Sequence, residues 1–311
     1  MARSGLTDLD TLFVRTAKEK MQHREGHFEG INRTPLYFQS WTAVNPKGLV
    51  IVVHGYGEHS GRYQNVVDTL VPEGYAVWAL DHRGHGRSEG RRCYVNRFTD
   101  FLKDLEIFEE KAREAHPELP VHVIGHSMGS LIANHYVASR KKQNYRSLTL
   151  SGTGAAPGPA IPSAVILLAR LLSAVTPKLS LPSGVDPAFI SHDPQVVDAY
   201  VNDPLVESEV TARLACEMMR ALPGMITAAQ RLTVPTMMQI GDEDESFHPD
   251  SWNRLFEAIA VKDKAFKKYD GCRHEVYNDT NKKLPLADLK DWINRHQQSG
   301  LHSNVPEPTL G

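Results

Sequence analysis

Cysteine is scarce in this 311-residue chain, which has only Cys93, Cys216 and Cys272. Three scattered cysteines are too few for a disulfide framework, and no Cys-x-x-Cys pair indicates a zinc site. This usage is typical of a reducing compartment, where thiols stay free. We therefore predict a cytoplasmic protein.

Long hydrophobic runs and an excess of charge are also missing. No segment approaches the roughly 20 apolar residues that a membrane-spanning helix needs, and the first residues show no apolar stretch of signal-peptide length. The 35 basic and 37 acidic residues nearly balance, so we predict no nucleic-acid partner. The 15 histidines include no His-Glu-x-x-His or similar helix-spaced pair, so we predict no metal site.

Hydrophobic residues make up 41% of the chain and are arranged as short runs separated by helix-length segments. Residues 25–41 alternate about a turn at 31–35, which predicts an antiparallel hairpin. Continuous apolar runs typical of buried parallel strands follow at 49–53, 75–80, 121–124, 147–150, 236–240 and 265–269. Helix-length segments lie between most of them, at 62–71, 98–116 and 250–260. The alternation predicts an α/β fold with a mostly parallel sheet and helices on both faces.

One interval, 155–231, breaks this alternation and contains helical patterns without a clear buried strand. It predicts an inserted helical cap between two parts of the core, 1–154 and 232–296, with a disordered tail at 297–311. The first helix candidate of the cap, 163–174, is apolar almost all round. Such a helix either packs into the cap and core, or it forms an acyl-chain tunnel or a surface that touches lipid.

The pentapeptide Gly-His-Ser-Met-Gly at 125–129 lies between the strand candidate 121–124 and a helix-like segment at 130–137. A serine in so sharp a turn has a strained backbone and an exposed hydroxyl, and glycines two residues away on either side relieve the crowding. The Gly-x-Ser-x-Gly pattern is weak evidence alone. Its position between a strand and a helix favours a nucleophile elbow, with Ser127 as the nucleophile.

A serine nucleophile needs a base and an acid that orients the base. The strand candidate 236–240 leads into four carboxylates at 242–245. We choose Asp244, because a Gly-x-x-Asp turn lets the strand end before the carboxylate turns back over the sheet edge. Asp242 and Glu245 are the alternatives.

The base is expected after the last strand candidate, 265–269. His274 follows that strand and is the only histidine between residues 248 and 296. The resulting order, Ser127, Asp244, His274, is that of α/β-hydrolases and differs from the orders in chymotrypsin-like and subtilisin-like proteases.

Donors for an oxyanion are expected from two backbone N–H groups. The loop His-Gly-Tyr-Gly at 54–57 directly follows the strand candidate 49–53, and Met128 heads the helix after Ser127. Such a loop can aim the N–H of Tyr56 at the same point as the N–H of Met128, where both would stabilise a tetrahedral intermediate.

With these residues in place, the chain resembles the monoacylglycerol lipase and lysophospholipase group of the α/β-hydrolase superfamily, which in bacteria also includes serine-aminopeptidase-like hydrolases. The resemblance spans about residues 25–296. It is carried by the segments 54–63, 81–90, 125–129 and 203–206 and by the turns of Asp244 and His274. It implies hydrolysis of glycerol monoesters and related carboxylic esters without a metal or organic cofactor, under a cap that guides the acyl chain. The chain departs from the group at Tyr56, where a small residue is frequent.

We therefore predict a serine ester hydrolase that cleaves monoacylglycerols or similar small lipid esters through an acyl-enzyme. The alternatives are a lysophospholipase or a general short- and medium-chain carboxylesterase, followed by an aminopeptidase, an acyltransferase or a non-catalytic small-molecule binding protein. Substrate-binding residues are expected in the cap, 155–231, which is also the candidate for transient contact with a lipid surface. The basic cluster Arg83, Arg87, Arg91 and Arg92 is either a salt-bridged loop or a site for a lysophospholipid headgroup.

Overall fold

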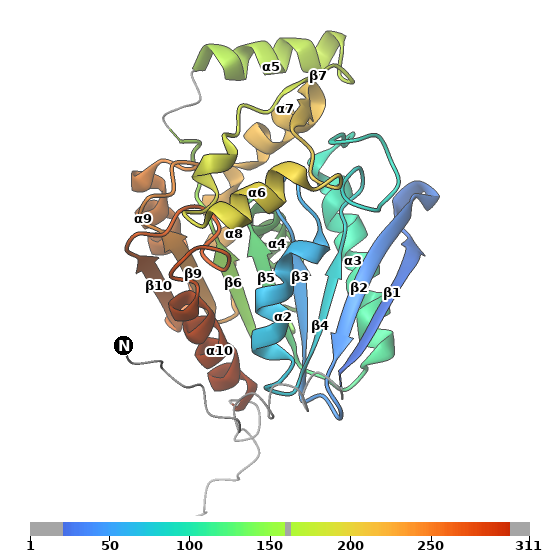
Figure 1. Cartoon of the computed structure of the whole chain (residues 1–311), viewed down its shortest axis with the longest axis vertical. Coiled ribbons are helices and arrows are strands. Elements are labelled where there is room, and N and C mark those ends of the chain that lie inside the picture. Colours follow the sequence, from blue (N-terminus) through green and yellow to red (C-terminus); the bar gives the residue numbers. More distant parts are fainter. Residues whose placement is uncertain (1–20, 159–162, 299–311) are drawn as a thin grey trace, which may run out of the picture.

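The computed structural model describes residues 21–158 and 163–298, which are organised around an eight-stranded sheet (Figure 1). The strands are β1 (Gln22–Glu29), β2 (Pro35–Thr42), β3 (Gly48–Val53), β4 (Tyr75–Leu80), β5 (Val121–His126), β6 (Ser147–Ser151), β9 (Thr236–Gly241) and β10 (Lys264–Tyr269). Their order across the sheet is β1-β2-β4-β3-β5-β6-β9-β10. β2 is antiparallel to both of its neighbours, and every pair from β4 to β10 is parallel. The predicted hairpin and the mostly parallel sheet are confirmed.

Helices cover both faces of this sheet. They are α2 (Gln64–Leu70), α3 (Phe98–Ala115), α4 (Met128–Ser139), α9 (Pro249–Ala258) and α10 (Lys283–Gln298), with short 3-10 turns at η1 (Ile31–Arg33) and η2 (Ser60–Tyr63). The predicted helices at 62–71, 98–116, 130–137 and 250–260 correspond to η2 with α2, to α3, to α4 and to α9. Helix α10 continues to Gln298, and the rest of the predicted tail, 299–311, lies outside the described residues.

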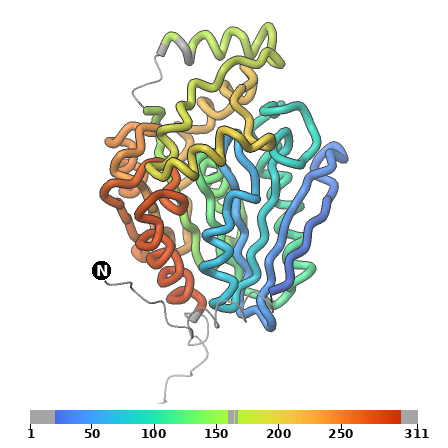
Figure 2. Tube along the Cα trace, in the orientation of Figure 1, coloured from blue at the N-terminus to red at the C-terminus, as the bar shows by residue number. Residues whose placement is uncertain are grey.

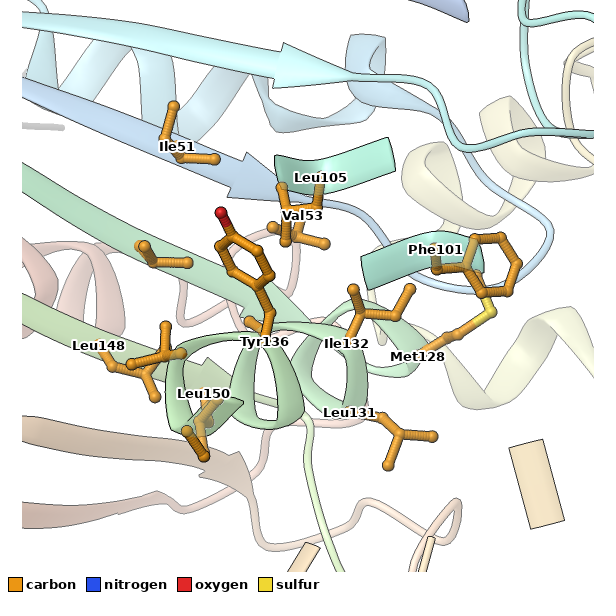
Figure 3. Packing of buried hydrophobic residues seen from close by; sticks show 14 of the residues in the cluster. Ile51, Val53, Phe101, Leu105, Met128, Leu131, Ile132, Tyr136, Leu148 and Leu150 are labelled. Atoms are coloured by element: carbon orange, nitrogen blue, oxygen red, sulfur yellow. The ribbon is translucent and has the colours of Figure 1, made fainter. Parts of the chain in front are cut away.

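Alternate residues of the central strands face two separate cores. On β3, Ile51 belongs to one hydrophobic cluster and its neighbours Val50 and Val52 to the other. Helices α3, α4 and α9 bury their apolar faces in the first cluster, and α2 and α10 in the second. Figure 3 shows how Ile132 and Tyr136 of α4 pack among side chains of the strands. Burial on both faces explains why β3 and β4 are apolar throughout.

The segment between β6 and β9 carries the predicted insertion. It contains α5 (Ser163–Val175), η3 (Pro187–Phe189), α6 (Pro194–Asn202), α7 (Ala212–Ala221) and α8 (Gly224–Ala229). The sequence did not predict a two-stranded antiparallel pair, β7 (Ser180–Pro182) with β8 (Glu209–Thr211), because three-residue strands are too short to show a period. In Figures 1 and 2, α6 lies over one end of the sheet strands and α5 lies farthest out, whereas α8 packs beside α4 and α9.

The two ends of the insertion differ in burial. Leu214, Leu222 and Met225 are fully or almost fully buried in the first core cluster. Helix α5 packs against α7, yet it exposes Leu167, Leu168, Leu171 and Val175, which are 58%, 51%, 59% and 81% accessible. The interpretation that α5 packs within the cap therefore holds for the face toward α7, but burial does not account for the exposed face. Among the described residues, no helix is long and apolar enough to span a membrane.

Candidate active site

Ser127 occupies the sharp turn between β5 and α4. Its backbone has φ 52° and ψ −120°, a conformation that residues with a Cβ rarely adopt. The turn is held by a hydrogen bond from the Ser127 N–H to the carbonyl oxygen of Ser151, at 3.0 Å. Ser127 is half-buried, whereas His126 before it and Met128 after it are buried. The structure thus gives Ser127 the strained geometry that the sequence pattern predicted.

Close backbone contacts require both glycines of the pentapeptide. A Cβ on Gly129 would lie 2.0 Å from the carbonyl oxygen of Val53, and a Cβ on Gly125 would lie 2.5 Å from the carbonyl oxygen of Gly129. Both contacts are with backbone, which cannot move aside as a flexible side chain would. The start of α4 therefore packs directly against the end of β3.

The predicted oxyanion loop, 54–57, touches the serine. A Cβ on Gly55 would lie 3.1 Å from the Cβ of Ser127. The N–H of Gly55 donates to Oε1 of Glu58 at 2.6 Å, which fixes the loop. Met128 is the first residue of α4, so its N–H has no acceptor within the helix. Tyr56 and Met128 thus lie on the two segments that adjoin Ser127, and their role as oxyanion donors stays a prediction.

The structure brings Asp244 and His274 together. Nδ1 of His274 lies 2.9 Å from Oδ2 of Asp244, and both side chains are buried. The N–H of Ser246 donates to the other carboxylate oxygen of Asp244 at 2.9 Å. The alternatives Asp242 and Glu245 are exposed. Asp244, and neither of these alternatives, therefore contacts the His274 ring, and its role as the acid stays a prediction.

His274 lies beside the residues that flank Ser127. A Cβ on Gly152 would lie 3.0 Å from Cε1 of His274, and Gly152 follows Ser151, whose carbonyl oxygen accepts from Ser127. The rings of His274 and His126 are 4.8 Å apart between centroids. The ends of β5, β6 and β9 and the loop after β10 thus converge at one place.

The charges around His274 favour its protonated form. Burial lowers the pKa of His274, but the charge and hydrogen bond of Asp244 outweigh burial and raise it above the ordinary value. Burial opposes the ionisation of Asp244 as well, and the same contact with His274 keeps the pKa of that carboxyl below its ordinary value. Burial, reinforced by the nearby His274, lowers the pKa of His126 to about 3. His126 is therefore neutral near pH 7 beside His274.

A buried network of Glu58, Arg62 and Glu275 beside His274 was missed in the sequence. Arg62 donates to both oxygens of Glu275, at 2.7 and 2.9 Å, and lies 3.5 Å from Glu58. Glu58 and Arg62 fall within the segment 54–63 that carries the family resemblance, and Glu275 directly follows His274. Nothing in their spacing along the chain shows that they meet, because Arg62 and Glu275 are more than 200 positions apart.

The insertion contacts the loop of His274. The N–H of Glu275 donates to the carbonyl oxygen of Ile190 at 2.9 Å, and the N–H of His274 points to that of Phe189 at 3.4 Å. This pairing places η3 directly against the backbone of His274.

A second contact joins the insertion to the 54–59 segment. The N–H of Glu207 donates to the carbonyl oxygen of Gly57 at 2.8 Å, and Nε2 of His59 lies 2.9 Å from Oδ2 of Asp203. The stretch 187–207, which contains α6, is therefore attached at one end to the loop of His274 and at the other to the predicted oxyanion loop.

The basic cluster is tied to the protein. Arg83 forms an ion pair with Asp104, Arg87 pairs with Glu25, and Arg91 and Arg92 donate to backbone carbonyl groups. These contacts favour the salt-bridged loop over the headgroup site. Within residues 21–158 and 163–298, no group of three or more histidine, cysteine or acidic side chains is arranged to hold a metal ion.

A mostly parallel sheet with a strained serine at a strand–helix turn, followed in the chain by an aspartate–histidine pair at later strand ends, defines an α/β-hydrolase. The family described as serine aminopeptidase, S33, matches residues 44–281, and the chain belongs to this family.

Several relatives are similar over nearly their whole length. The monoacylglycerol lipase of Mycolicibacterium smegmatis is 35% identical, over 88% of this chain and 97% of the relative. The human monoglyceride lipase is 32% identical, over 87% of this chain and 90% of the relative. The crystal structure of the monoacylglycerol lipase of Paleococcus ferrophilus superposes with a TM-score of 0.75 at 29% identity, covering 88% of this chain and 99% of that one. The resemblance predicted from the motifs is confirmed.

Proposed function

We propose that this protein is a serine ester hydrolase that cleaves monoacylglycerols or similar small lipid esters through an acyl-enzyme. The observation that carries the proposal is the hydrogen bond between His274 and Asp244 beside the strained turn of Ser127. Relatives that are monoacylglycerol lipases, similar over more than four-fifths of the chain, support the substrate class.

The reaction follows from the positions of these groups. His274 takes the proton of the Ser127 hydroxyl as its oxygen attacks the ester carbonyl, and Asp244 holds the ring and stabilises the imidazolium. The N–H groups of Tyr56 and Met128 bind the oxyanion of the tetrahedral intermediate. When the intermediate collapses, the proton on His274 goes to the departing alcohol. Water then attacks the acyl-enzyme and gives a proton to His274. When this second tetrahedral intermediate collapses, His274 returns the proton to the oxygen of Ser127, and the carboxylic acid is released.

We further propose that residues 155–231 act as a cap that receives the acyl chain and touches the lipid surface from which it comes. Large hydrophobic side chains that are exposed concentrate in this segment, at Leu167, Leu168, Leu171, Val175, Leu179, Leu181, Val185, Phe189 and Val201. Elsewhere in the described chain only Val44 and Leu284 are of this kind. An exposed apolar surface of this extent is typical of a site that contacts a partner or a membrane.

A cytoplasmic location is also proposed. Cys93, Cys216 and Cys272 are all buried and free, as is usual where thiols stay reduced.

The second candidate is an amide-cleaving peptidase, because the family is described as serine aminopeptidases. Ester and amide substrates would be attacked by the same serine, so the geometry of Ser127, Asp244 and His274 does not separate them. Ester substrates are favoured because the relatives in the comparison are monoacylglycerol lipases.

A substrate profile tests the proposal. The purified protein is assayed with p-nitrophenyl esters of graded chain length, 1- and 2-monoacylglycerols, lysophosphatidylcholine and an aminoacyl p-nitroanilide. We expect the highest kcat/KM on monoacylglycerols or p-nitrophenyl esters. Preference for the anilide would replace the proposal by the peptidase, and preference for lysophosphatidylcholine would replace it by the lysophospholipase. A fluorophosphonate that labels the wild type but not Ser127→Ala identifies the nucleophile in the same preparation.

A further inference from the structure

Glu275 is a buried carboxylate whose hydrogen bonds are satisfied by side chains. Arg62 donates Nη1 to Oε1 and Nη2 to Oε2, at 2.7 and 2.9 Å, in the two-pronged geometry that makes such pairs strong. The amide of Asn278 donates to Oε2 at 2.8 Å. The side chain of Glu275 is only 6% exposed, so its charge is poorly screened by water.

Arg62 continues this contact to the opposite side of the site. It lies 3.5 Å from Oε2 of Glu58, whose Oε1 accepts the N–H of Gly55, the residue before Tyr56. The guanidinium also lies over the ring of Tyr200 in α6, 4.5 Å from its centroid. A chain of charge-assisted contacts therefore runs from the residue after His274 to the residue before Tyr56.

We propose that Glu275 is a positioning residue for the ester hydrolase reaction: through Arg62 it fixes the loop of His274 against the loop of Tyr56, and its charge stabilises the imidazolium of His274. The inference rests on the proposed role of His274 as the general base. It assigns to Glu275 two effects, one on geometry and one on charge, which different substitutions separate.

The charged groups around His274 identify Glu275 as the carboxylate that supplements Asp244. Asp244 faces the ring from the turn after β9, His126 from the end of β5, and Glu58 and Arg62 from the segment after β3. Burial raises the pKa of Glu58. Burial acts on Glu275 as well, but the Arg62 guanidinium outweighs it and holds the pKa of that carboxyl below its ordinary value. Glu275 is thus the more firmly ionised of the two.

Each acyl-transfer step passes through an imidazolium on His274, so a neighbouring negative charge that stays ionised lowers the energy of those states. The same charge makes His274 more basic and places the pH below which activity falls at a higher value. A carboxylate that served only to hold the fold would not move this pH limit.

The test is the pH dependence of kcat/KM with p-nitrophenyl butyrate for Glu275→Gln. The substitution keeps the size and one acceptor but removes the charge. We expect the acidic limb to move to lower pH by about 0.5 to 1 unit and kcat to fall about tenfold. Glu275→Asp keeps the charge but shortens the side chain, so its limb stays in place while kcat falls because the two-pronged contact with Arg62 is lost.

Glu109→Gln is the matched control, because Glu109 is also buried and paired with an arginine, Arg113 at 2.6 Å, but lies on α3 away from His274. It should reduce stability and leave the acidic limb in place. An acidic limb of Glu275→Gln equal to that of the wild type overturns the effect on charge, and a wild-type kcat in Glu275→Asp overturns the effect on geometry. If Glu275→Gln does not fold, Glu275→Asp still decides the second point. Failure of the proposed function is a different result, namely a Ser127→Ala variant that keeps its activity.

Discussion

The site at the strand ends and helix α5 differ in how far their side chains are buried and paired with other groups. Around His274, polar groups are buried and hydrogen-bonded, and backbone contacts leave no room for a Cβ on Gly125 or Gly129. Helix α5 instead exposes four large apolar side chains. The strand ends are fixed by many contacts, whereas the outer face of α5 is exposed and is available to contact another apolar surface.

This difference separates two tasks. Bond cleavage needs groups held to within a fraction of an ångström, which a strained turn between buried elements provides. Delivery of a lipid needs an apolar surface that water can leave, and we propose that the exposed face of α5 serves as that surface. Changes at the strand ends should therefore alter turnover of every ester, and changes on α5 only the turnover of substrates in a lipid surface.

Ser127→Ala, a change at the strand ends, should have the largest effect. We expect kcat to fall by a factor of about ten thousand or more on soluble and lipid substrates alike, with an unchanged melting temperature. The loss of one hydroxyl removes the nucleophile but leaves every backbone contact of the turn. Steady-state kinetics and thermal denaturation measure the two parts, and substantial remaining esterase activity in a pure sample would refute the assignment.

Asp244→Asn should lower kcat about a thousandfold to ten-thousandfold, because an amide cannot stabilise the imidazolium or select the same tautomer. The variant also tests the electrostatics. Folding raises the pKa of His274. The stability that this histidine contributes is therefore present below about pH 6.5 and is lost as pH rises through the raised pKa. Folding lowers the pKa of Asp244. The stability that this carboxylate contributes is therefore present above about pH 4 and is lost as pH falls through the lowered pKa.

The pair therefore stabilises the fold most between about pH 4 and 6.5. The free energies of unfolding of the wild type and of Asp244→Asn, measured by denaturant titration at pH values below, within and above this range, should differ most within it. A difference that is constant with pH would mean that the ion pair does not act as described.

Gly129→Ala should destabilise the fold by about 1–3 kcal/mol, because the added methyl group would meet the backbone of Val53 and push the start of α4 away from β3. Activity should fall with it, since the same shift displaces Ser127 and Met128. Gly184→Ala is the control for adding a methyl group, as nothing lies within 4 Å of that position, although its φ of 74° adds backbone strain of its own. Chemical denaturation of both variants gives the comparison, and equal losses would rule out the contact with Val53 as the cause.

Leu167→Ser with Leu171→Ser should have the smallest effect and the most selective one. Turnover of soluble p-nitrophenyl butyrate should stay within about twofold of the wild type, because exposed side chains contribute little to stability. Binding to phosphatidylcholine vesicles and hydrolysis of monoacylglycerol within them should fall several-fold. Val44→Ser, which changes a residue 63% exposed outside the insertion, is the matched control. If turnover of p-nitrophenyl butyrate and hydrolysis of monoacylglycerol in vesicles fell equally, α5 would not be the segment that delivers the substrate.

The sheet and the candidate site were largely predictable because each depends on local patterns. Apolar runs predicted β3 and β5 to within a few residues. The Gly-x-Ser-x-Gly pattern predicted the turn at Ser127, where the backbone has a strained φ of 52° and the two glycines leave room for it. Of the four carboxylates after β9, Asp244 is the one that lies within hydrogen-bond distance of His274, as the turn pattern indicated, and its role as the catalytic acid stays a prediction.

The remaining features depend on contacts between distant parts of the chain. The pairing of Arg62 with Glu275 leaves no trace in spacing, because the two residues meet only when the sheet is complete. The exposure of Leu167 could not be predicted either, since an apolar helix has the same sequence whether it faces a core or solvent. The bounds of the cap, 155–231, stay a prediction.

The two attachments of the stretch 187–207 limit how this enzyme could be re-engineered. If residues 155–231 act as the proposed cap, exchanging them with the corresponding segment of a relative is a way to change acyl-chain preference. A graft that replaced Ile190 and Glu207 without matching the backbone of Glu275 and Gly57 would release the loops on both sides of the serine. A chimera cut within 163–186 leaves those joints intact, so that region is where new specificity is best introduced.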